Sequence, residues 1–241
     1  MKLGEYGSHI EFSKFSCGTL LALLVLTVTY GTAKLLLALA WRDLLKHFGI
    51  VASTRWVVRT YDITQLAKYV PGNILHLASR QAIGQAAGLP PWPVAKSAVW
   101  ELGLMSAAGS LFAVLVVTFF LDGVTDLMAL SAYFAAVGVT TWSAYRWVGP
   151  WMALGLGWYV VFLALSSICF FVILSLVVSP GAITDSSIVG LCGAYVVAWL
   201  AGLVTPAPLP VSVYGNCRFL PFCTRLSQKP ICFRLSYLGG W

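Results

Sequence analysis

Residues 152–178 read MALGLGWYVVFLALSSICFFVILSLVV, without one charged side chain. An α-helix crosses the hydrocarbon core of a bilayer with about 20 consecutive apolar residues. This run is therefore long and apolar enough to span a membrane. In water such a helix would need an apolar partner on every face.

Four further runs in the chain are apolar over a similar length, at about 15–40, 97–121, 127–145 and 187–205. Of the 241 residues, 59% are hydrophobic and 10% are charged, whereas soluble domains carry roughly 25% charged residues. We therefore expect an all-α, polytopic membrane helix bundle of about five transmembrane helices, formed by residues 1–208. No HExxH, GxSxG or paired acidic motif occurs, so we expect no enzymatic activity, cofactor or metal site.

The basic residues fall in alternate loops. Residues 41–96 carry an excess of Lys and Arg, and the C-terminal tail is also basic, whereas the loop with Asp122 and Asp126 is acidic. Cytoplasmic loops of membrane proteins are enriched in Lys and Arg. This predicts a multi-pass protein of the cytoplasmic (inner) membrane, with the N-terminus outside and residues 41–96 and the C-terminus on the cytoplasmic side. The net charge of +7 then reflects orientation, and no nucleic-acid partner is expected.

Five tryptophans should mark the inner interface: Trp41, Trp100, Trp142, Trp147 and Trp151.

The last apolar run places small residues at intervals of four, at Gly190, Ala194, Ala198 and Gly202. Such a stripe lets another helix approach closely.

One segment does not fit a simple span. Residues 61–93 read YDITQLAKYVPGNILHLASRQAIGQAAGLPPWP, too polar to cross as a straight helix and too apolar for a solvated loop. Pro71-Gly72 breaks any helix, and a restarted helix should run from Asn73 to Gly88. Two interpretations remain open. The helix lies in the inner interface with its bases on anionic headgroups, or it enters the bilayer as a re-entrant hairpin buried in protein.

Polar side chains share one face of this predicted helix, at Asn73, His76 and Arg80. Glu101 lies about one turn inside the next apolar run, where an acid is costly unless it is paired. We expect Arg80 to be its partner; the alternative places Glu101 at the headgroup level. In the re-entrant interpretation, the helix N-terminus after Pro71-Gly72 would form a site for a lipid phosphate together with Lys68 and Arg80.

The same residues resemble a known motif. Lys68, Tyr69, Pro71, Gly72, Leu77 and Arg80 match K-Y-x-P-G-x-x-x-x-L-x-x-R, as in the flippase-like integral membrane family that includes the transmembrane region of lysylphosphatidylglycerol synthases. Glu101 matches a glutamate often found in the following helix. The resemblance covers roughly residues 20–208. It implies lipid transport, with phospholipid or a lipid-linked precursor bound and translocated, and headgroup binding at Lys68, Tyr69, Pro71, Gly72, Asn73, His76, Arg80 and Glu101.

A second motif of that family, P-x-G-L-G-x-R-E, should follow Pro206 but is absent. Read from the third base of the Pro210 codon, the degenerate code permits Gly-Leu-Gly-Val-Arg-Glu-Leu. We interpret residues 209–241 as a non-native, disordered tail produced by a frameshift.

Two alternatives to transport therefore stay open. The chain is a non-transporting membrane subunit or anchor for an envelope-lipid enzyme, which would be a membrane or cytoplasmic partner, or it is an inactive frameshifted product. Its oligomeric state is not predicted.

Overall fold

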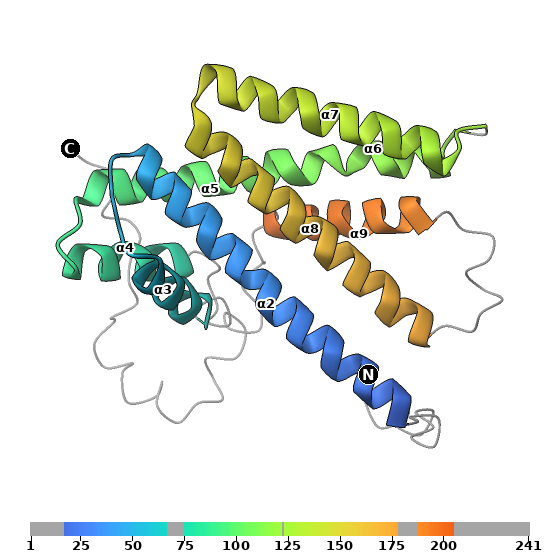
Figure 1. The fold of residues 1–241 in the computed structure, drawn as a ribbon, viewed down its shortest axis with the longest axis horizontal. Helices are drawn as coiled ribbons and strands as arrows, with labels where there is room; N and C mark the ends of the chain where they lie inside the picture. The colour runs from blue at the N-terminus through green and yellow to red at the C-terminus, as the bar shows by residue number, and fades with distance from the viewer. Residues whose placement is uncertain (1–16, 67–74, 122, 178–187, 205–241) are drawn as a thin grey trace, which may run out of the picture.

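The computed structural model describes residues 17–66, 75–121, 123–177 and 188–204 (Figure 1). The described parts contain helices and no strand. The chain is an all-α, polytopic membrane helix bundle, as the sequence predicts. In chain order the helices are α2 (Cys17–His47), α3 (Thr54–Leu66), α4 (Leu75–Ala86), α5 (Pro91–Leu111), α6 (Ala113–Val116), the 3-10 helix η3 (Val117–Phe119), α7 (Asp126–Trp147), α8 (Pro150–Val177) and α9 (Ile188–Val204).

Four stretches are long and apolar enough to cross a membrane, namely Gly18–His47, Pro91–Phe119, Asp126–Trp147 and Pro150–Leu176, while α9 is a shorter apolar helix. The first two extend beyond the expected ranges of about 15–40 and 97–121. Helix α2 continues past Trp41 through the charged residues Arg42, Asp43 and Lys46 and ends at His47. Proline lacks only an N–H that is already unpaired in a first helical turn, so α5 can begin at Pro91.

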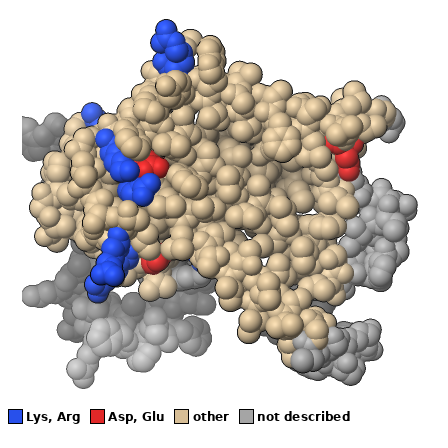
Figure 2. Space-filling model, viewed as in Figure 1, with Lys and Arg blue, Asp and Glu red and all other residues tan. Residues whose placement is uncertain are grey.

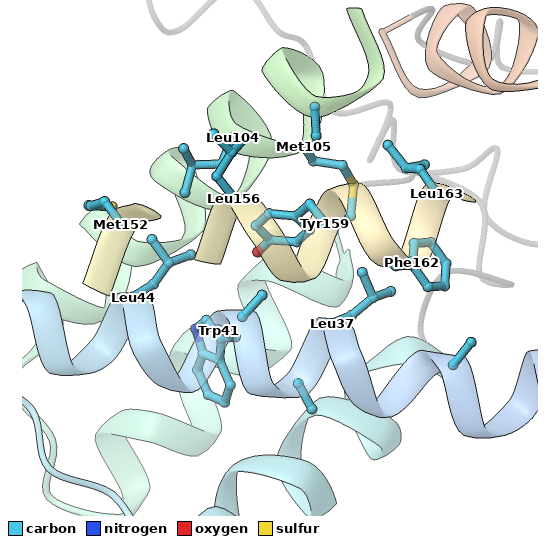
Figure 3. Packing of buried hydrophobic residues seen from close by; sticks show 14 of the residues in the cluster. Leu37, Trp41, Leu44, Leu104, Met105, Met152, Leu156, Tyr159, Phe162 and Leu163 are labelled. Atoms are coloured by element: carbon cyan, nitrogen blue, oxygen red, sulfur yellow. The ribbon is translucent and has the colours of Figure 1, made fainter. Parts of the chain in front are cut away.

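Helices α2 and α8 lie side by side and form the centre of the bundle (Figure 1). Their facing side chains make the buried core together with residues of α5 (Figure 3). Asp43 joins the two helices at the end where α2 finishes. Its carboxylate accepts a hydrogen bond from Trp158 Nε1 at 3.0 Å and pairs with Arg42 and Lys46 at 3.0 and 3.5 Å. The core side chains labelled in Figure 3 are Leu37, Trp41, Leu44, Leu104, Met105, Met152, Leu156, Tyr159, Phe162 and Leu163.

On the face shown in Figure 2, Lys and Arg side chains gather near the end of the bundle where α2 finishes and α5 begins. Asp126 lies at the opposite end, at the start of α7. The charge distribution along the bundle therefore agrees with the loop pattern of the sequence.

Helix α9 packs closely against the irregular end of the second span, formed by α6 and η3. A Cβ added to Gly190 would lie 2.6 Å from Thr118 Oγ1, and one added to Gly193 would lie 2.9 Å from the backbone oxygen of Phe112. The expected small-residue stripe is correct at Gly190 but not at Gly202, where a Cβ would meet nothing within 4 Å. The closest approach uses Gly190 and Gly193, a spacing of three.

We therefore predict that Gly193→Val lowers the stability of the purified protein. The added side chain must displace backbone as well as side chains, and overpacking a core typically costs about 1–3 kcal/mol. The thermal unfolding midpoint in detergent should fall. The matched control is Gly103→Ala in α5, whose Cβ would meet nothing within 4 Å. Equal midpoints for wild type, Gly193→Val and Gly103→Ala would contradict the close packing of α9.

Candidate functional site

A turn between α4 and α5 brings Arg80 opposite Glu101. Gly88 has a φ of +80° and ends α4. Its N–H donates to the carbonyl of Gln85 and the N–H of Leu89 to that of Gly84, both at 2.9 Å, which is a Schellman motif. Arg80 lies on α4 before this turn and Glu101 on α5 after it, and the turn folds the two helices back so that the two side chains meet.

Arg80 and Glu101 form a buried ion pair between guanidinium Nη1 and carboxylate Oε2. Their side chains are 1% and 6% exposed. The predicted pairing is therefore present, whereas the depth of Glu101 relative to the headgroups stays a prediction. Arg80 also does not reach outward to headgroups as in the interfacial interpretation, because the ion pair draws it into the bundle.

Aromatic side chains enclose this ion pair. The Tyr61 hydroxyl of α3 donates a hydrogen bond to Glu101 Oε1 at 2.9 Å. The Arg80 guanidinium lies 4.3 Å from the centre of the Tyr61 ring and 5.0 Å from that of Trp41, in the geometry of cation–π contacts. Trp41 Nε1 donates to Ser97 Oγ at 3.1 Å. The ion pair thus ties together α2, α3, α4 and α5.

Trp41 was expected in the interfacial belt of tryptophans, but it is buried in the bundle. Its side chain is fully buried and points from α2 away from α8 (Figure 3). The position at the end of an apolar run made it resemble an anchor, but the cation of Arg80 attracts the ring inward. Trp142 and Trp147 are exposed, at 65% and 85%, as an interfacial position requires.

Several buried polar atoms around the ion pair have no hydrogen-bond partner among the described residues. They are Nε and Nη2 of Arg80 and the hydroxyl of Tyr159. Tyr159 lies in α8 close enough to interact electrostatically with both Arg80 and Glu101. Unpaired buried polar groups cost free energy, so this is the polar region of an otherwise apolar bundle.

The helices α3 and α4 lie outside the four candidate spans. Burial, reinforced by the nearby carboxylate of Glu101, raises the pKa of the Tyr61 phenol well above its usual value. Burial alone would lower the pKa of Arg80, but the charge of Glu101 outweighs it and the net pKa is raised. Tyr61 therefore remains a hydrogen-bond donor and Arg80 remains a cation.

Helix α4 turns its polar face toward the protein. His76 and Arg80 are buried and Gly84 packs against Val94, whereas Ala78 and Ala82 are exposed. An amphipathic helix on a water-covered surface would have the opposite arrangement.

The predicted site is only partly described. Lys68, Tyr69, Pro71, Gly72 and Asn73 lie outside the described residues, so their proposed contacts with a headgroup stay predictions. The structure brings Arg80, His76 and Glu101 to one region. It adds Tyr61, Trp41 and Tyr159, which carry no charge and gave no signal in the sequence.

Among the described residues, no group of three His, Cys, Asp or Glu side chains could hold a metal ion. Comparison of the chain with models of protein families, with curated proteins and with solved structures found no match. The family resemblance therefore remains a prediction that rests on the motif itself.

We predict that Arg80→Met and Glu101→Gln each destabilise the protein by about 3–5 kcal/mol, because each leaves one buried partner uncompensated. The double variant should lose clearly less than the two single losses combined. A double-mutant cycle on unfolding in detergent measures this coupling.

Tyr61→Phe is the control for the cycle. It removes one hydrogen bond to a charged acceptor, which is worth about 1.5–3 kcal/mol, and leaves the ion pair in place. Strictly additive losses for Arg80→Met and Glu101→Gln would show that the pair is not coupled.

Proposed function

We propose that this protein binds a phospholipid or a lipid-linked precursor within the bundle and translocates it between the two leaflets. The observation that supports this best is the packing of α3 and α4. These two helices are not candidate spans, yet their polar side chains pack against α2 and α5, which are candidate spans. Charged groups within a membrane bundle are costly and commonly line the routes of polar substrates.

We also propose that α3 and α4 form a re-entrant hairpin. Non-spanning backbone at membrane depth is tolerated where it is buried in protein or lines a wet cavity. Helix α4 has the exposure pattern for this position, with small apolar residues outward and Arg80 inward. The ion pair with Glu101 then holds the hairpin against α5.

The proposed location is the cytoplasmic membrane, with the basic end of the bundle on the cytoplasmic side. The concentration of Lys and Arg at this end (Figure 2) supports the orientation through the positive-inside rule.

The alternative is a non-transporting membrane subunit or anchor for an enzyme of envelope-lipid synthesis. An apolar groove of about 850 Å³ between α7 and α8 favours it. Gly138, Ala153 and Gly157 are among its lining residues, and small residues let a transmembrane helix of a partner approach closely.

The re-entrant hairpin predicts the reactivity of single cysteines. In a chain whose native cysteines are replaced by alanine, Ala78→Cys should be protected from a membrane-impermeant maleimide in inside-out vesicles and become reactive in detergent. Ala78 is exposed on the protein, so only the bilayer can shield it. Gln85→Cys, which lies near the basic end and is also exposed, should react without detergent. Equal reactivity of the two cysteines in intact vesicles would place α4 on the membrane surface.

Lipid movement is tested by reconstitution. Vesicles with wild-type protein should expose an acyl-labelled fluorescent phospholipid of the inner leaflet to an impermeant quencher, whereas protein-free vesicles should not. The double variant Arg80→Met/Glu101→Gln, verified as folded by its thermal midpoint, should move the lipid more slowly.

Unchanged movement in that double variant would contradict the role of the Arg80–Glu101 pair in holding the hairpin for translocation. No movement by folded wild-type protein, together with a co-purifying envelope-lipid enzyme, would favour the anchor.

A further inference from the structure

A cavity of about 430 Å³ lies beside the ion pair, between α2, α3, α5, α8 and α9. Its polar lining comes from Lys34 of α2 and from Asp62 and Gln65 of α3, and its apolar lining includes Phe162 and Trp199. Lys34 lies about 20 Å along α2 from the end of that helix at His47, at 1.5 Å per residue. This lysine therefore lines a cavity well inside a candidate span.

The charged and polar side chains that line this cavity do not pair with one another. No hydrogen bond or ion pair joins Lys34 or Asp62 to any other described residue. The Lys34 ammonium lies over the Tyr30 ring, 5.4 Å from its centre, and Asp62 is exposed and also lines an open pocket with Arg55 and Arg59. The amide Nε2 of Gln65 is buried and has no hydrogen-bond partner in the described part of the chain. The cavity therefore offers one cation, one anion and one amide donor, unlike the neighbouring ion pair, whose charges neutralise each other.

A second, apolar cavity adjoins the first. It has a volume of about 300 Å³ and is lined by residues that include Leu23, Leu26, Phe170 and Ile173. Tyr30 lines both cavities. From Tyr30 the second cavity extends toward the N-terminal end of α2 and the C-terminal end of α8. The ring of Phe170 stacks on Tyr195 of α9 with centroids 4.5 Å apart and forms part of its wall.

We infer that the two cavities form one lipid site, selective for a zwitterionic headgroup that carries both a phosphate and a primary ammonium. Lys34 and Gln65 donate to the phosphate oxygens, Asp62 accepts from the ammonium, and an acyl chain fills the apolar cavity beyond Tyr30. An anionic headgroup without an ammonium leaves Asp62 unpaired, and a quaternary ammonium has no N–H to donate to it. This inference rests on the proposed function, since it names the headgroup class that the bundle takes.

The binding test uses the full-length protein in detergent. Native mass spectrometry measures retention of dioleoyl phosphatidylethanolamine, phosphatidylglycerol and phosphatidylcholine, each added separately at equal concentration. We expect phosphatidylethanolamine to bind about tenfold more tightly than the other two, which corresponds to about 1.4 kcal/mol. Asp62→Asn should abolish this preference, and Lys34→Met should weaken binding of all three lipids.

Matched controls remove the same charges elsewhere. Asp126→Asn at the opposite end of the bundle and Lys96→Met at the start of α5 should leave the preference unchanged. Equal retention of the three lipids by wild-type protein, or an unchanged preference in folded Asp62→Asn, would overturn the inference.

The site and the proposed function fail in different ways. If wild-type protein moves lipid in vesicles but shows no headgroup preference, the zwitterionic site is wrong and translocation stands. If it shows the preference, loses it in Asp62→Asn and yet moves no lipid, the site stands and the proposed translocation is wrong.

Discussion

The buried ion pair between Arg80 and Glu101 is the interaction on which the arrangement of this bundle depends. Removing one partner leaves a buried charge uncompensated, at a typical cost of about 3–5 kcal/mol. Neither charge can therefore leave while the other stays, and the helices that carry them must remain adjacent. Tyr61 adds α3 to this unit through its hydrogen bond to Glu101, and Trp41 adds α2 through its contact with the guanidinium. The requirement that Arg80 and Glu101 stay paired thus holds α3 and α4, which are not candidate spans, against the spans of α2 and α5.

The rest of the bundle provides the rigid frame for that unit by ordinary packing. In lipid there is little hydrophobic force between apolar helices, so close contact and buried hydrogen bonds hold them together. The glycines of α9 supply the close contact, and the bond from Trp158 to Asp43 supplies a hydrogen bond across α2 and α8.

The sequence predicted the helical class and the Arg80–Glu101 pair because both follow from solvation. Long uncharged runs require lipid, and an acid inside such a run requires a cation that a short turn can bring to it. The burial of Trp41 and the roles of Tyr61, Asp43 and Tyr159 could not be predicted, because they depend on which helix faces which.

The contrast between the two charged regions is informative about function. Arg80 and Glu101 are close, buried and enclosed by rings, so little electrostatic attraction is left over for a ligand. Lys34 and Asp62 line one cavity without pairing with each other, and the Asp62 side chain is exposed. Two unpaired charges of opposite sign beside an apolar cavity suit a ligand that carries the complementary charges and brings its own apolar chain.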